Sequence, residues 1–222
     1  ATAMDNPFLQ PSPLPYQTPQ FDRIRDEHYA PAFEAGMKEQ LAEVAAITAQ
    51  TEPPTFANTI EAMERSGAFL ARVSNVFFAM AQANTNDNLQ AVQRQFAPKL
   101  AAHGDAIMLD RALFARVHAL FVQKDKLGLD AEQLAVLERY HRDFVRAGAQ
   151  LDEAAQAKLR ELNQELSKLG AEYQQRLLAA NKEAAVVVDA DEQVELREHS
   201  SRVGEVVEIR PEVDRCKAFA RN

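Results

Sequence analysis

The chain has 222 residues, of which 46% are hydrophobic and 26% are charged, with a single cysteine and a formal net charge of −8. A globular chain of this length buries roughly 70% of the surface that its unfolded form exposes. One cysteine excludes an internal disulfide, the acidic balance disfavours nucleic acid as a partner, and no apolar run is long enough to span a membrane.

The first thirty residues predict an extended arm. Five of the ten prolines lie between residues 5 and 25, a density that cannot sustain a helix and is typical of a segment laid over a surface. We therefore expect residues 1–30 to pack on the rest of the protein as a proline-rich arm. The first residues, ATAMDNPF, lack a basic segment followed by an apolar run, so no intact secretory signal is expected.

Residues 31–182 predict a helical domain. Apolar residues recur at steps of three and four over residues 33–47 and again over residues 60–80, which is the spacing of amphipathic helices. Asn58, with Glu61 three residues later, predicts the start of the second helix. Gly67 fills a gap in the apolar stripe of that helix, where a neighbouring backbone can approach closely.

A polar stretch, NTNDN at residues 84–88, directly follows the second apolar pattern. Its side chains offer oxygen ligands, but it lacks the alternating acidic positions and the distant glutamate of a calcium loop. Asp87 with Gln90 three residues later instead resembles the start of a helix. We therefore predict a turn rather than a binding site.

Three further helices are predicted between residues 89 and 145. The apolar stripe of the first contains Pro98, which predicts a kink or a break near residues 94–97. Asp110 is expected to cap the next helix, and Gly128 followed by Asp130 to end it and start another.

A long helix is predicted over residues 151–180, and it would extend roughly 45 Å. Such a helix needs a partner along its length, and its apolar residues follow near-heptad steps: Leu159, Leu162, Leu166, Leu169, Tyr173 and Leu177. Residues 183–222 mix valine with charge without a helical or strand period and predict an irregular tail. The expected fold is all-α, a bundle of about six helices with an extended arm and an irregular tail.

No motif predicts a catalytic, cofactor-binding or metal site. Zinc on one helix face needs two histidines four apart with a glutamate between them, and the five histidines do not meet this requirement: His28, His103, His118, His141 and His199. There is no glycine-rich phosphate loop and no G-x-S-x-G nucleophile motif.

The remaining reactive residue types have structural interpretations. His103 and His141 lie on apolar stripes and are expected to be buried, hydrogen-bonded core residues. Glu161 and Glu165, one turn apart, are expected to be surface charges rather than a catalytic pair. The lone Cys216 lies in the tail without local groups that would lower its pKa.

Several segments carry a resemblance to a known family, among them LPYQTPQFDRIRDEHYAPAFEAGM, PTFANTIEAMERSG, VFFAMAQANTND, RDFVRAGAQL and LNQELSKLGAEYQQRLLAANK. In this order they resemble the amino-terminal helical region of bacterial peptidyl-dipeptidases in the thimet oligopeptidase (M3) family of zinc metallopeptidases. The resemblance covers about residues 6–193, whereas residues 194–222 are not family-like.

The resemblance implies a helical, clam-like enzyme with a deep channel, located in the bacterial cytoplasm or periplasm. Its catalytic half would carry zinc on an HExxH helix with a further glutamate, and it would release dipeptides from the carboxyl end of short peptides. This chain contains no HExxH. Residues 31–182 are therefore expected to form the channel-wall half, without zinc and inactive alone, with short peptides and the missing catalytic half as partners.

Two other functions remain open at this point. The near-heptad leucines also suit a stand-alone helical module that binds another protein. A small hydrolase that uses the acidic pairs is a third possibility.

Overall fold

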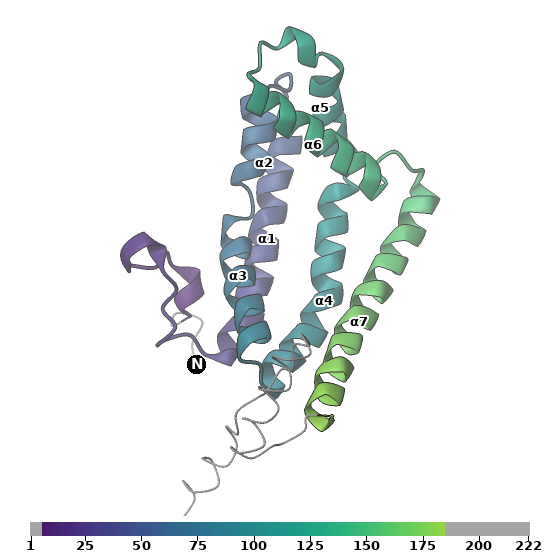
Figure 1. The fold of residues 1–222 in the computed structure, drawn as a ribbon. Helices are drawn as coiled ribbons and strands as arrows, with labels where there is room; N and C mark the ends of the chain where they lie inside the picture. The colour runs from purple at the N-terminus through teal and green to yellow at the C-terminus, as the bar shows by residue number, and fades with distance from the viewer. Residues whose placement is uncertain (1–5, 185–222) are drawn as a thin grey trace, which may run out of the picture. The chain divides into compact units, whose positions relative to one another are not determined.

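The structure is a computed structural model that describes residues 6–184. The chain divides into two units, residues 1–174 and residues 175–222, and the described part of the second unit continues the last helix. The helices are α1 (Tyr29–Thr48), α2 (Ala62–Arg65), α3 (Ala68–Ala83), α4 (Asp87–Met108), α5 (Arg111–Val122), α6 (Ala131–Ala147) and α7 (Glu153–Glu183) (Figure 1). No strand occurs among the described residues, so the predicted all-α class is confirmed.

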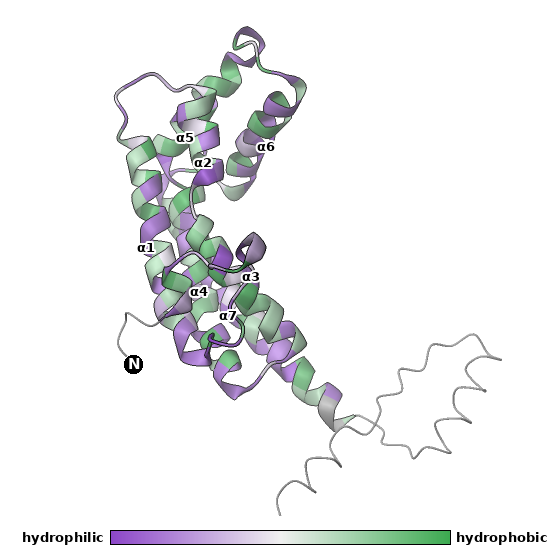
Figure 2. Ribbon diagram, turned by 90° about the vertical axis from the view of Figure 1, so that its left-hand side faces the viewer, coloured by the Kyte–Doolittle hydropathy of each residue, from purple (hydrophilic) through white to green (hydrophobic). Residues whose placement is uncertain are grey.

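Apolar and polar residues are interleaved along the helices, as amphipathic packing requires (Figure 2). An aromatic core lies between α1, α3 and α4. The ring of Phe33, fully buried, meets Phe77 edge-on at 5.2 Å and stacks on Phe96 at 5.1 Å between ring centroids. Tyr29 and Phe8 extend this core toward the arm.

A second core joins the other end of α1 to α2, α5 and α6. Its buried members are aliphatic with one aromatic ring: Val44, Ile47, Ile60, Met63, Leu113, Val117, Leu120, Leu137, Phe144 and Ala149. Because α1 contributes to both cores, this helix ties the two ends of the first unit together.

The arm is anchored at its start. Phe8 is buried, its backbone oxygen accepts a hydrogen bond from Arg72 at 2.8 Å, and Asn6 donates to the backbone oxygen of His28 at 2.8 Å. Farther along the arm, Tyr16 and Phe21 are exposed.

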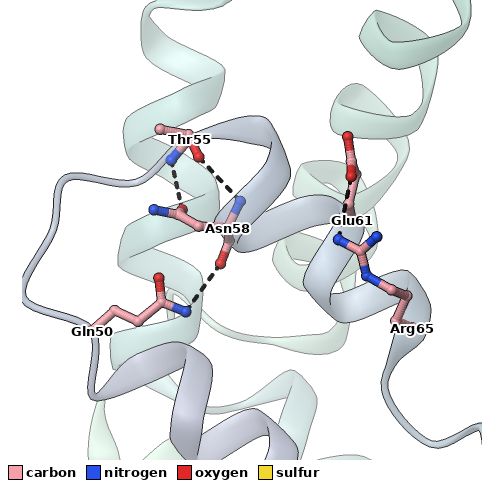
Figure 3. Close-up of polar contacts among 5 residues, drawn as sticks. All are labelled: Gln50, Thr55, Asn58, Glu61 and Arg65. Atoms are coloured by element: carbon pink, nitrogen blue, oxygen red, sulfur yellow. Dashed lines mark hydrogen bonds and ion pairs between the residues drawn. The ribbon is translucent and has the colours of Figure 1, made fainter.

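The second predicted helix starts earlier than expected. A π-helical turn (Phe56–Glu61) precedes α2, and Thr55 caps it: Oγ1 of Thr55 accepts from the backbone N–H of Asn58 at 3.0 Å, and Oδ1 of Asn58 accepts from that of Thr55 at 2.7 Å (Figure 3). The predicted cap pair of Asn58 and Glu61 is therefore wrong. Glu61 pairs with Arg65 instead, at 3.3 Å.

The same predicted helix is interrupted at Ser66 and Gly67, which separate α2 from α3. Gly67 has a φ of 74°, in the left-handed region, and its backbone N–H donates to Glu43 at 2.7 Å. A Cβ at this position would lie 2.3 Å from Nε2 of Gln40. The expected close approach exists, but the neighbour is a side chain of α1 rather than a backbone.

Gly67→Ala is expected to lower the free energy of unfolding by about 1–2 kcal/mol, because a side chain disfavours the left-handed conformation and Gln40 would have to move. Gly104→Ala is the matched control. Gly104 lies within α4 with open space around it, so alanine there should raise the free energy of unfolding by about 0.5–1 kcal/mol. Urea unfolding of both variants checks this, and equal effects would contradict it.

The turn predicted within the polar stretch at residues 84–88 is present at residues 84–86, between α3 and α4. Its cap is Asn86 rather than Asp87: Oδ1 of Asn86 accepts from the backbone N–H of Leu89 at 2.9 Å, and Asp87 is the first residue of α4. The amides of Asn86 and Asn88 also donate to Oδ2 of Asp26, at 3.0 and 3.3 Å. The turn therefore ties the start of α4 to the end of the arm.

The helix starts predicted at Asp110 and Asp130 agree with the structure, whereas α5 ends at Val122 and not at the predicted stop, Gly128. Asp110 and Asp130 cap α5 and α6 through the backbone N–H groups of Leu113 and Gln133, at 2.7 and 2.9 Å. Of the kink or break predicted near residues 94–97, the break is wrong, because α4 runs through Pro98 without interruption, and the kink stays a prediction. No helix of the described residues is long and apolar enough to cross a membrane.

Candidate functional site

His103 is a buried histidine between α1 and α4, as predicted. Its Nε2 lies 2.7 Å from the amide oxygen of Gln40, which can only accept a hydrogen bond, so Nε2 carries the proton. Nδ1 has no hydrogen-bond partner among the described residues. Burial lowers the pKa of His103 below its ordinary value of 6.5, and the residue is neutral in the folded protein at pH 7.

His141 pairs with His118 at the surface of α5 and α6. Nε2 of His141 lies 3.0 Å from Nδ1 of His118, and its ring stacks on Phe121 with centroids 3.8 Å apart. Burial lowers the pKa of His141 most, and the charges of His118 and then Lys124 lower it further. The expectation of a core position is wrong here, since His141 is only half-buried and its partner is exposed.

The described residues do not fit a zinc site. Among residues 6–184, no group of three or more His, Cys, Asp or Glu side chains lies close enough to hold a metal ion. The pair of His118 and His141 supplies only two nitrogens, and the ammonium of Lys124 acts on the same ring and opposes a cation. Cys216 lies outside the described residues.

Acid is expected to destabilise the protein through its neutral histidines. His103 and His141 have lowered pKa values in the folded state, so the unfolded state binds more protons below pH 6.5. The free energy of unfolding should therefore fall from pH 7 to pH 5.5, and His103→Gln should make this fall smaller. Denaturant titrations at both pH values measure it.

The control for this prediction is the interval from pH 7 to pH 8, where histidine is mostly neutral in both states and His103→Gln should change the slope far less than it does between pH 7 and pH 5.5. Stability that rises on acidification from pH 7 to pH 5.5 would contradict the prediction.

An acidic pocket of about 450 Å³ lies between the π-helical turn, α2 and α6. Two of its carboxylates already have side-chain partners: Glu64 accepts from Arg139 at 3.0 Å and from the hydroxyl of Tyr140 at 2.7 Å, and Glu61 pairs with Arg65. Burial and the bond to Glu64 raise the pKa of Tyr140. These are structural contacts rather than a free acid and base.

The predicted surface pair on α7 is likewise solvated. Glu161 is exposed and pairs with Lys158 at 3.2 Å, and Glu165 is exposed as well. The structure therefore brings no catalytic carboxylate pair together on this helix.

A groove of about 350 Å³ lies between α3, α4 and α7, within the first unit. Its walls are aromatic and aliphatic on one side and small on the other: Phe77, Phe78, Phe96, Ala97, Leu100, Ala101, Ser167, Gly170 and Ala171. Gln93 of α4 donates to the side chain of Gln174 at 3.2 Å, and both residues line the groove. Small residues on α4 and α7 thus leave space for an apolar group.

The relatives found by comparison with known proteins are peptidases by name. No family model matches the chain. Over 184 residues, or 83% of the chain, the sequence is 49% identical to the dipeptidyl carboxypeptidase of Escherichia coli strain K12, and equally to that of Salmonella typhimurium strain LT2. It is 24% identical over 177 residues to oligopeptidase A of Escherichia coli.

The resemblance to peptidyl-dipeptidases is confirmed over the matched residues, which are similar to part of a dipeptidyl carboxypeptidase. The chain spans only 27% of the length of the dipeptidyl carboxypeptidases that it matches. The matched region therefore corresponds to about a quarter of such a protein.

Proposed function

We propose that the chain is the substrate-channel part of a zinc peptidyl-dipeptidase that releases dipeptides from the carboxyl end of short peptides. The observation that carries the proposal is the 49% identity to dipeptidyl carboxypeptidase over 184 residues. The 24% identity to oligopeptidase A, a second peptidase by name, supports the same assignment.

The chain is proposed to be inactive alone. A zinc peptidase needs a bound metal to activate water and to polarise the peptide carbonyl. The described residues offer no group of metal ligands, and the full sequence contains no HExxH motif. Zinc and the catalytic groups would then come from the part of the enzyme that corresponds to the unmatched length of the relatives.

The contribution of this chain would be a rigid wall. Phe33, Phe77 and Phe96 lock α1, α3 and α4 together, and buried aromatic packing of this kind gives a single well-ordered arrangement. Helices held in this way can border a channel that admits short, extended peptides and excludes folded proteins.

Two proteins test this proposal. One is the purified chain with added zinc, and the other is the Escherichia coli enzyme with its matched region replaced by the corresponding residues of this chain. Each is incubated with an amino-blocked short peptide, and release of the carboxyl-terminal dipeptide is followed with and without chelator. The chain alone should release nothing, whereas the chimera should show chelator-sensitive release.

Two results would overturn the proposal. Chelator-sensitive release by the chain alone, together with retention of one zinc per chain, would mean that it holds a catalytic centre of its own. A chimera that is folded by circular dichroism but does not cleave the peptide would mean that this chain cannot replace the channel part.

A stand-alone interaction module is the second candidate, and exposed leucines on α7 favour it. Such a module would bind its partner without any contribution to peptide cleavage. An inactive chimera together with capture of a protein unrelated to peptidases would favour this function.

A further inference from the structure

The middle of the apolar stripe of α7, after Leu159, does not face the helices against which α7 packs. Leu162, Leu166, Leu169 and Tyr173, here named the leucine face, are 51–70% exposed. The sequence predicts that this stripe meets a partner along the helix, and within the first unit no described helix covers it.

A different face of α7 makes the contacts within the first unit. Gln156 is buried and donates to the backbone oxygen of Gly148 at 3.3 Å. Asn163 donates to Asp105 of α4 at 2.8 Å, and Ala171 is 6% exposed. The residues on this face are polar or small, and they bury little apolar surface.

The two faces are separated by a fixed rotation. Asn163 directly follows Leu162, and Ser167 directly follows Leu166, so the leucine face lies about 100° around the helix from the face that packs. Four large apolar side chains in a row on one helix form a contiguous patch, and such a patch marks an interaction surface.

We propose that the leucine face is the docking surface for the part of a full-length peptidase that lies outside the matched region. This inference rests on the proposed function. The dipeptidyl carboxypeptidases extend over about four times the matched length, since the match spans 27% of each. Polypeptide that could cover the face therefore exists in those relatives and has no counterpart in this chain.

The shape of the surface indicates a helix as the covering element. Leu162, Leu166, Leu169 and Tyr173 follow steps of four, three and four, the spacing that accepts the side chains of a second helix. Beside them Gly170 lines the groove, and nothing lies within 4 Å of where its Cβ would be. A large apolar side chain of the docking helix can enter there.

The charges beside the leucine face disfavour a second copy of this chain. Glu165 and Glu172 directly precede Leu166 and Tyr173. If two α7 helices paired antiparallel about Leu166 and Leu169, Glu165 of one copy would lie near Glu172 of the other, and like charges at such positions repel. The docking helix is therefore expected to carry basic residues opposite these two glutamates.

Cysteine labelling tests the inference in the whole chain and in the chimera. Leu166→Cys is introduced into both proteins, together with Cys216→Ser in the chain, whose only native cysteine this removes. The rate at which maleimide modifies residue 166 itself, located by peptide mass spectrometry, is measured in both proteins. We expect Leu166→Cys to react in the chain as fast as Val122→Cys, a matched control whose native residue is 72% exposed on α5. In the chimera Leu166→Cys should react at least about ten-fold more slowly than in the chain, because reaction then requires local opening.

Equal rates in the chain and the folded chimera would overturn the docking surface. A second result would also overturn it. If Leu166→Cys reacts more slowly than Val122→Cys in the chain alone, and this difference disappears on dilution, a second copy of the chain covers the leucine face. If the chimera does not fold, the intact Escherichia coli enzyme with cysteine at the residue aligned with Leu166 gives the same two outcomes.

Peptidase activity of the chimera separates this inference from the proposed function. An active chimera whose Leu166→Cys reacts freely would overturn the docking surface alone. An inactive, folded chimera whose Leu166→Cys is protected would overturn the channel role alone.

Discussion

Arg116→Met is expected to lower the free energy of unfolding by about 3–5 kcal/mol. Arg116 is only 9% exposed and donates to the backbone oxygens of Gln50 and Glu52, both at 3.3 Å, and to Oδ1 of Asn58 at 3.0 Å. It also donates to Oγ1 of Thr59 at 3.3 Å. Methionine fills a similar volume but removes all of these hydrogen bonds, one to the buried Thr59 and the others to part-buried oxygens, and each bond from a charged donor contributes about 1.5–3 kcal/mol at most. Guanidinium unfolding followed by circular dichroism measures the change.

Arg65→Met is the matched control. Arg65 is exposed and forms an i,i+4 surface pair with Glu61 at 3.3 Å, so its replacement should change the free energy of unfolding by about 0.5 kcal/mol or less. If both variants unfold at nearly the same denaturant concentration, Arg116 does not hold the segment around residues 50–59.

Phe33→Ala is expected to cost about 3–5 kcal/mol. The Phe33 ring is fully buried between Phe77 and Phe96, and alanine would remove both ring contacts and leave a cavity where α1, α3 and α4 meet. The loss should appear as a lower midpoint of thermal and denaturant unfolding. Phe33→Leu should lose less, because it keeps part of the volume.

Phe21→Ala tests whether this effect depends on burial. Phe21 is 54% exposed on the arm, and its replacement should change the free energy of unfolding by about 0.5 kcal/mol or less. A loss for Phe33→Ala as small as that for Phe21→Ala would show that the aromatic core relaxes into the cavity and does not lock the three helices.

Helix starts marked by a local signal could be predicted from the sequence. Asp110 and Asp130 cap helices because their side chains bind backbone N–H groups only three residues away, an interaction that sequence spacing contains. The turn at residues 84–88 is likewise local, although its cap is displaced by one residue to Asn86.

The break between α2 and α3 could not be predicted, because its cause is distant in sequence. The apolar stripe of residues 60–80 continues in phase across Gly67, so periodicity gives no sign of an interruption. The conformation of Gly67 instead accompanies contacts with Gln40 and Glu43 of α1, which only the tertiary structure brings into place.

The leucines of α7, the groove and Arg116 can be divided in the same way, by whether their cause is local or distant in the sequence. The leucines of α7 were visible as a stripe, but periodicity says that a face is apolar and not which face packs. The groove was missed entirely, since Ala97 and Ala101 on α4 and Gly170 on α7 become neighbours only in the fold. Arg116 was missed as well, because a buried arginine without a carboxylate partner leaves no charge pattern in the sequence.

The hydrogen-bond acceptors of Arg116 determine how this part of the protein responds to low pH. Carbonyl and hydroxyl oxygens bind no proton in mildly acidic solution, so the contacts of Arg116 with Gln50, Glu52 and Thr59 persist under conditions that weaken ion pairs of Glu and Asp. The proline-containing loop at residues 49–55 is therefore held by hydrogen bonds that mild acid does not break. Mild acid is instead expected to act where a neutral histidine lies buried, at His103 on α4.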